Sequence, residues 1–202
     1  MSKAILISIR PEWCELIASG EKTIEIRKSC PKLAYPFKCY IYCTKPKFEH
    51  EDYIVFNAGT ENARGFYCGG KVIVEFVCDA VFPISFYASD ASFFDAEPPL
   101  PVPGTRLTDK EIADYLGNGK TGYGWNISDF EIYDEPMLLT GFQIECPRVY
   151  CVETCKHYKK DCNSFGFRPL NRPPQSRRYV HDSGFVNEKM FHKQSNAQEE
   201  DR

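Results

Sequence analysis

The sequence predicts an α+β protein built on a small mixed β-barrel with two or three short helices. Strand-like runs separated by turns dominate the first 145 residues, and short helical segments interrupt them. At 202 residues and 43% hydrophobic content, the chain is long and apolar enough for one core. We expect a barrel domain at residues 1–145, a basic Cys-rich C-terminal arm at residues 146–180 and a disordered tail at residues 181–202.

The N-terminal elements follow from local patterns. Residues 4–9 form an apolar, β-branched run that predicts a buried strand. Pro11 suits the first position of a helix, and apolar residues at helical spacing follow it until Gly20 ends the helix. Residues 22–27 alternate with period two, which places Ile24 and Ile26 on one face of the strand and the charges of Glu25 and Arg27 on the other.

Further strands are predicted at residues 38–44 and 71–78, with a polar insertion or long loop at residues 45–69 between them.

The second half of the predicted domain opens on a Pro-rich run at residues 97–104, which excludes a helix or an inner strand there. Residues 108–111 match a capping box and predict a short helix that ends near Gly117. Residues 122–133 then predict one more strand, closed by Pro136.

Charge is distributed unevenly along the chain, whose net charge is -3. Residues 1–146 hold 14 Lys and Arg against 21 Asp and Glu, whereas residues 147–180 hold 8 against 2. The basic segment suits an anionic partner such as nucleic acid, or is a solvated face. The chain has no apolar run long enough to span a membrane and no signal peptide, so we expect a cytoplasmic protein with no membrane partner.

The string G-x-K-x-x-E-x-R at residues 20–27 is the first candidate site. Gly20 ends the helix, Lys22 opens the strand, and Glu25 and Arg27 share one strand face about 7 Å apart. Such a set can grip a polar ligand. The alternative is an ordinary strand whose charges are solvated and pair across the sheet.

The helix, this motif and its place near the N-terminus resemble the ASCH domains of the PUA-like superfamily. The resemblance covers roughly residues 3–142 and includes the strand-like residues 70–76. It also includes residues 124–128, a segment that is similar to phage and gut-bacterial members of the family. It implies a β-barrel whose cleft is lined by the motif, with RNA or another nucleic acid as the ligand. By carry-over, the motif residues Gly20, Lys22, Glu25 and Arg27 belong to that cleft.

Chemistry suggests roles for these residues. Lys22 suits a phosphate or the activation of a nucleophile, Arg27 is a planar fork for a phosphate or carbonyl edge, and Glu25 orients Arg27 or accepts from a base amino group. Tyr123 or Trp125 offers a stacking face for a base, although a Trp at such a position is more often a core residue.

The alternative function is a small hydrolase acting on RNA or a modified nucleoside. Some bacterial ASCH proteins resemble amidohydrolases for acetylated cytidine, with a Thr three residues after the motif Lys, but here that position is Glu25, which cannot replace a hydroxyl nucleophile. Lys22 and Glu25 remain the catalytic candidates as a base and acid pair. A third class is a protein-interaction module whose acidic body meets the partner.

Ten cysteines in a reducing compartment divide into two groups. Six lie singly in apolar or strand-like stretches and are expected to be buried thiols: Cys14, Cys30, Cys39, Cys43, Cys68 and Cys78.

The other four lie within seventeen residues and predict one structural zinc ion, held by Cys146, Cys151, Cys155 and Cys162. His157 is an alternative ligand to Cys146. Incidental thiols are the rival interpretation, and an iron–sulfur cluster is less favoured because nothing nearby indicates redox chemistry.

The arm ends in residues 172–180, where Arg177 and Arg178 allow two readings. They form a cationic strap beside the cleft that adds phosphate contacts, or they lie on a strand that packs Tyr179 and Val180 back on the barrel. The Arg-Pro-Pro-Gln-Ser stretch at residues 172–176 resembles the C-terminal ending of phage-type ASCH proteins, and this resemblance favours the return strand.

Overall fold

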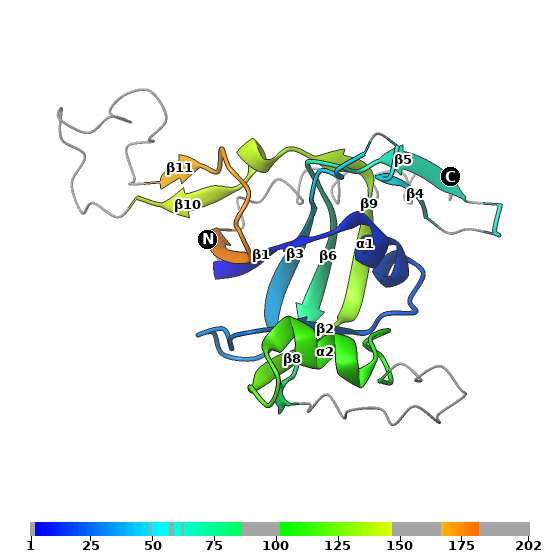
Figure 1. Ribbon diagram of the computed structural model, residues 1–202. Coiled ribbons are helices and arrows are strands. Elements are labelled where there is room, and N and C mark those ends of the chain that lie inside the picture. The colour runs from blue at the N-terminus through cyan, green and yellow to red at the C-terminus, as the bar shows by residue number, and fades with distance from the viewer. Residues whose placement is uncertain are drawn as a thin grey trace, which may run out of the picture.

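The chain folds around one large twisted sheet with a helix on one side and two smaller sheets attached (Figure 1). The computed structural model describes residues 3–48, 50–56, 59–61, 63–85, 102–146 and 167–181. In chain order, the described elements are β1 (Lys3–Ile9), α1 (Pro11–Ala18), β2 (Ile24–Arg27), β3 (Phe37–Cys43), β4 (Tyr53–Phe56), β5 (Arg64–Tyr67), β6 (Lys71–Cys78), β7 (Val81–Ile84), α2 (Asp109–Leu116), β8 (Gly122–Asn126), β9 (Ser128–Met137), the 3-10 turn η1 (Leu139–Gly141), β10 (Gln143–Glu145), β11 (Phe167–Pro169) and β12 (Arg177–His181).

The large sheet has the order β11-β10-β12-β1-β3-β6-β9. Strands β1 and β3 are parallel, with α1 and β2 in the connection between them, and the other pairs in this sheet are antiparallel. The second sheet has the order β2-β8-β7, and the third is the β4–β5 hairpin.

The closed barrel predicted from the sequence is not formed by the described strands, which make three separate sheets. The single strand predicted at residues 122–133 is also wrong, because the chain changes sheets at Ile127. The N–H of Ile127 donates to the carbonyl of Thr23, and two residues later Asp129 has a φ of 43°. Pro136 lies within β9, at the sheet edge, where its missing N–H breaks no ladder.

Two apolar cores lie on opposite faces of the large sheet because side chains alternate along β1. Ile5 and Ile7 face the core that α1 and the β4–β5 hairpin cover. Leu6 faces the second core, which includes Val180 from β12 and Ile144 from β10. The strand at the centre of the sheet therefore supplies both.

Both predicted helices are confirmed. Pro11 occupies the first turn of α1, and α2 begins with the predicted capping box between Thr108 and Glu111. The apolar face of α2, with Ile112 and Leu116, packs against Ile26 of the second sheet.

The stretch predicted as irregular at residues 45–69 contains the β4–β5 hairpin. Ile54 and Phe56 are almost fully buried in the first core, whereas Tyr53 and Tyr67 pair across the hairpin on its outer face. A two-stranded hairpin with one apolar face is stable only because that face covers the core.

Residues assigned by the sequence to the basic arm supply β11 and β12 of the large sheet, except that β12 ends at His181, the first residue of the predicted disordered tail. Residues 182–202 of that tail lie outside the described residues. β12 lies between β10 and β1, with Tyr179 opposite Ile5 and Val180 opposite Ala4, so the return strand is confirmed. None of the described helices is long and apolar enough to span a membrane.

We predict that Leu6→Ala lowers the free energy of unfolding by about 2–5 kcal/mol, since the side chain is fully buried at the centre of the sheet and its loss leaves a cavity. Urea denaturation measures the change. Leu138→Ala is the matched control: Leu138 is 64% exposed, and its replacement should change stability by less than about 0.5 kcal/mol. Equal effects of the two substitutions would contradict this description of the core.

Candidate functional site

The turn after α1 leads the chain directly into β2 and so positions the motif residues. Gly20 has a φ of 78°, a conformation that favours glycine, and its N–H bonds to the carbonyl of Ile17. The N–H of Lys22 bonds back to the carbonyl of Leu16, which reverses the chain into β2. Gly20 itself is exposed and does not line the cavity described below, so its part here is to shape the turn.

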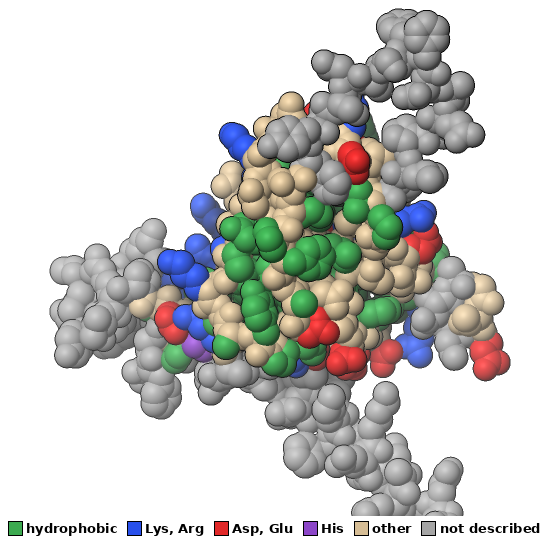
Figure 2. Space-filling view, turned by 90° about the horizontal axis from the view of Figure 1, so that it is seen from below, with side chains coloured by type: hydrophobic (Ala, Val, Ile, Leu, Met, Phe, Trp, Pro, Cys, Tyr) green, Lys and Arg blue, Asp and Glu red, His purple; other side chains and the backbone are tan. Residues whose placement is uncertain are grey.

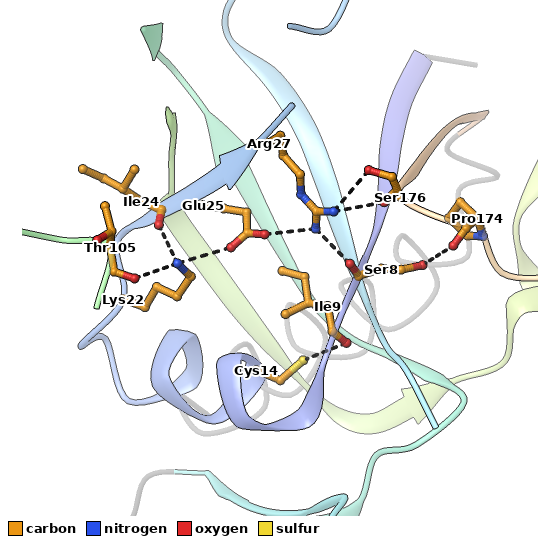
Figure 3. A network of polar contacts seen from close by, with 10 residues as sticks. All are labelled: Ser8, Ile9, Cys14, Lys22, Ile24, Glu25, Arg27, Thr105, Pro174 and Ser176. Carbon is orange, nitrogen blue, oxygen red and sulfur yellow. Dashed lines mark hydrogen bonds and ion pairs between the residues drawn. The ribbon is translucent and has the colours of Figure 1, made fainter. Parts of the chain in front are cut away.

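Lys22 is buried, with only 2% of its surface exposed. Its Nζ donates to the carbonyls of Ile24 at 2.9 Å and Thr105 at 2.8 Å, and lies 3.3 Å from Oε2 of Glu25 (Figure 3). Since an ammonium has three N–H donors, all of them have acceptors within the protein. Nζ also lies 5.5 Å from the ring centroid of Trp13.

The loop at residues 102–107 is folded so that a carbonyl meets Lys22. Thr105 is fully buried, its Oγ1 donates to the carbonyl of Val102 at 2.8 Å, and it accepts from the N–H of Leu107 at 3.0 Å. The carbonyl of Gly104 accepts from the N–H groups of residues 23 and 24, which fixes the loop along β2.

Glu25 links Lys22 to Arg27. Its Oε1 lies 3.1 Å from Nη2 of Arg27, while its Oε2 faces Lys22, so one carboxylate neutralises parts of two buried cations. We call Lys22, Glu25 and Arg27 the charged triad. Arg27 is 5% exposed, and its Nη2 also donates to the carbonyl of Ser8 at 2.9 Å. Its Nε is buried and lacks a hydrogen-bond partner within the described structure.

The segment before β12 closes this side of the site. Ser176 accepts from Nη1 of Arg27 through its carbonyl and its Oγ, both at 3.4 Å. Ser8 donates its hydroxyl to the carbonyl of Pro174 at 2.6 Å, and its N–H bonds to the carbonyl of Ser176 at 3.0 Å. Residues 174–176 thus hold Arg27 in place from a distant part of the sequence.

Burial sets the acid–base properties of the site. Desolvation lowers the pKa of Lys22, although the nearby Glu25 carboxylate opposes this shift. Burial also raises the pKa of Tyr115, a residue of α2.

The triad forms one wall of an open cavity of about 360 Å³. It is lined by four groups of residues: Ser8, Ile9, Arg10 and Trp13 from β1, α1 and the residue between them, Lys22 from the turn before β2, Glu25, Ile26 and Arg27 from β2, and Leu107, Glu111, Asp114 and Tyr115 from α2 and the loop before it.

The sequence missed the contribution of α2. Its capping box predicts the helix, but nothing local indicates that Glu111, Asp114 and Tyr115 face the triad. Tyr115 is 40% exposed, and Nζ of Lys28 lies 5.0 Å from its ring centroid. The aromatic ring that lines the cavity therefore has a cation next to it.

Trp125, predicted as a stacking residue, lies in the first core with no exposed surface and does not line the cavity. Arg177 is fixed over the ring of Trp125, with its guanidinium carbon 5.6 Å from the centroid, and donates to the carbonyls of Ser29 and Cys30. Arg178 is exposed on β12, opposite Leu6. The structure therefore gives Arg177 a structural role in holding the loop after β2.

The isolated thiols behave largely as expected. Cys14, Cys39, Cys43, Cys68 and Cys78 are buried, and Cys30 is partly exposed. Burial raises the pKa of Cys68 and Cys78 to about 12 each, so both stay protonated at neutral pH.

Of the predicted zinc ligands, only Cys146 falls within the described residues, directly after β10 and as a free thiol. Cys151, Cys155 and Cys162, and the alternative ligand His157, lie outside them. The described part of the chain contains no group of three or more metal-ligating side chains that could hold an ion.

No family model matches the sequence, and no curated protein matches it. The fold is similar to that of an ASCH protein from Zymomonas mobilis, whose crystal structure superposes with a TM-score of 0.50 and 17% identity over 94% of each chain. Two mutants of that protein give TM-scores of 0.51: one at 17% identity over 95% of this chain and 98% of the mutant, the other at 16% over 93% and 95%. The chain therefore has the same fold as this ASCH protein, in line with the resemblance of its motif.

We predict that Glu25→Gln lowers the free energy of unfolding by about 3–5 kcal/mol, because it leaves two buried cations without their counter-charge. Urea denaturation at neutral pH measures the loss. Glu21→Gln is the matched control: Glu21 pairs with Arg106 at 3.0 Å, but both side chains are about half exposed, so its replacement should cost less than about 1 kcal/mol. A cost no larger than that of the control would show that the triad is solvated.

The burial of Lys22 also predicts how the free energy of unfolding depends on pH. The pKa of Lys22 in the folded protein lies below 10.5, its ordinary value in an unfolded chain. At a pH between these two pKa values, Lys22 carries a proton in the unfolded chain that it has lost in the folded protein. The stability of the wild-type protein relative to Lys22→Met should therefore rise as the pH increases through that window. A constant or falling difference would contradict the burial of the charged amine.

Proposed function

We propose that this protein binds single-stranded RNA and that the cavity beside the charged triad takes one unstacked base. The observation that carries the proposal is the open cavity, which the ring of Tyr115 lines together with the polar side chains of the charged triad, Glu111 and Asp114. An aromatic face beside polar side chains suits an unstacked base, which stacks on the ring while its polar edge meets those side chains. A volume of about 360 Å³ lies within the range of about 300–1,000 Å³ usual for ligand pockets.

The surroundings of the cavity favour a base over a bare phosphate inside it. The triad cations are already neutralised in part by Glu25, and Glu111 and Asp114 add two carboxylates to the lining. Figure 2 shows hydrophobic side chains gathered at the middle of one molecular face, with most of the cations and carboxylates towards its borders. Stacking and hydrogen bonding therefore carry more of the recognition than net charge does.

Exposed cations remain at the rim for the RNA backbone. Arg10 lines the cavity with 68% of its side chain exposed, and its ion pair with Glu12 is at the surface and weak. Lys28 stands beside Tyr115. The similarity to ASCH folds supports RNA as the nucleic acid, in line with the resemblance of the motif.

A hydrolase acting on RNA or a modified nucleoside at the same cavity is the second candidate. The lowered pKa of Lys22 favours it, since a neutral amine can act as a base. It ranks second because both oxygens of Glu25 face cations and every donor of Lys22 has an acceptor, which leaves neither group directed at a substrate.

We predict that a labelled RNA of about 12 nucleotides, within the site size of about 4–16 usual for one such domain, binds the wild-type protein in an anisotropy titration. Tyr115→Ala should weaken binding about 5- to 150-fold through lost stacking, and Arg10→Ala should reduce the salt slope by about 0.7. Phe130→Ala is the control, since Phe130 is 41% exposed on β9 and does not line the cavity.

Cleavage is followed in the same samples on a denaturing gel and, with acylated nucleosides, by product analysis. Turnover that Lys22→Met abolishes without loss of binding would replace the binding function by the hydrolase. Binding that Tyr115→Ala leaves unchanged would overturn the placement of the base.

We also propose one structural zinc ion held by Cys146, Cys151, Cys155 and Cys162. Protein purified without chelator should carry about one zinc per chain by elemental analysis, and Cys151→Ser with Cys155→Ser should abolish it. Metal-free protein whose cysteines in residues 146–162 all react with a thiol reagent under native conditions would end this proposal.

A further inference from the structure

The β4–β5 hairpin carries an aromatic face that neither core uses. Tyr53 and Tyr67 are opposite each other on its outer side, with 50% and 53% of their surfaces exposed. Their ring centroids lie 5.0 Å apart at an interplanar angle of 62°, and His50 lies 5.8 Å from the ring of Tyr67. Val55, on the same face, is 38% exposed. We call Tyr53, Tyr67 and His50 the tyrosine platform.

The platform is held in a fixed position. The ring of Tyr53 lies across Gly65, so closely that a Cβ at that position would collide with its hydroxyl. On the inner side of the same strands, Ile54 and Phe56 are almost fully buried, which fastens the hairpin to the first core. Ordered rings lose little conformational freedom when a ligand stacks on them.

A groove of about 620 Å³ runs beside the platform, between the start of α1 and residues 44–54. Its cations are Arg10, Lys45 and Lys47, and Tyr53 forms part of its wall. Three carboxylates also line it: Glu12, Glu15 and Glu51. The balance of charge means that stacking, rather than attraction of phosphates, gives this surface its affinity.

Arg10 connects the groove to the proposed base site, because it lines both the groove and the cavity of the charged triad. Helix α1 packs against β4 and so holds the two sites on one side of the molecule. The cavity and the groove thus meet at Arg10, and Tyr53 lines the groove.

We propose that the tyrosine platform is a second stacking site for the same single strand of RNA, whose bases pack on Tyr53 and Tyr67 while another base occupies the cavity. This inference rests on the proposed RNA binding. Aromatic faces beside exposed cations suit a ligand that combines flat bases with a charged backbone, and this surface is indifferent to sequence because every base offers a π-face.

The test compares RNAs of about 3 and about 12 nucleotides on the full chain. Tyr67→Ala should weaken binding of the longer RNA about 5- to 150-fold and leave the shorter one, which reaches only the cavity, unchanged. Tyr67→Phe keeps the ring and should bind like the wild type. Phe130→Ala removes an exposed aromatic elsewhere and should have no effect, and thermal melting checks that every variant is folded.

Stacking is read directly by placing 2-aminopurine along the longer RNA. At least one position should be quenched on binding to the wild-type protein and not to Tyr67→Ala, and the loss of affinity should persist at high salt. If Tyr67→Ala binds the longer RNA like the wild type while Tyr115→Ala does not, the platform is overturned and the cavity site stands. If the wild type binds neither RNA, both proposals fail together.

Two further outcomes would also overturn the platform. Equal losses in Tyr67→Phe and Tyr67→Ala would assign the effect to the hydroxyl group rather than to stacking. A wild-type dimer in sedimentation that Tyr67→Ala converts to a monomer, with RNA binding unchanged, would assign the face to contact between two copies.

Discussion

The charged triad is the interaction on which the rest of the site depends. Lys22 ties β2 to the loop at Thr105, and Arg27 ties β2 to Ser8 and to the segment that leads into β12. Glu25 makes this arrangement tolerable, because two cations buried without a carboxylate would carry a large desolvation cost. Nearly all of the polar atoms of these side chains form hydrogen bonds or ion pairs within the protein. They therefore fix the shape of the cavity wall, and within the described residues the buried Nε of Arg27 has no hydrogen-bond partner.

Stability and recognition come from different parts of the molecule. The two apolar cores on either side of the large sheet hold the strands together through burial of apolar surface. The cavity lies where that sheet, the smaller β2-β8-β7 sheet and α2 come together, so its walls belong to elements that the cores already fix. The cavity is therefore largely preformed, which under the proposed binding function limits the entropy lost when a ligand enters it.

Local patterns predicted the elements whose causes are local. The Pro11 start of α1, the capping box of α2 and the alternation of residues 22–27 depend on neighbours in sequence, and all three are found. The β4–β5 hairpin was missed because its polar surroundings hide the alternation of Tyr53 with Ile54. The switch of sheets at Ile127 and the open sheets were missed because they depend on partners far along the chain, whereas the core position of Trp125 is the alternative that the sequence had left open. The motif residues were found, whereas Tyr115 and Ser176 reach them only through the fold.

The placement of β1 between β12 and β3 has a consequence for biosynthesis. Ser8 is held by Pro174, 166 positions later, and Arg27 by Ser176. On a growing polypeptide, one edge of β1 and the guanidinium of Arg27 stay uncovered until the stretch around residues 174–181 has been made. Contacts so distant in sequence form slowly, and exposed strand edges invite association in the meantime. The Arg27 side chain in the cavity wall therefore gains its contacts with Ser176 only once the chain has grown by a further 149 residues.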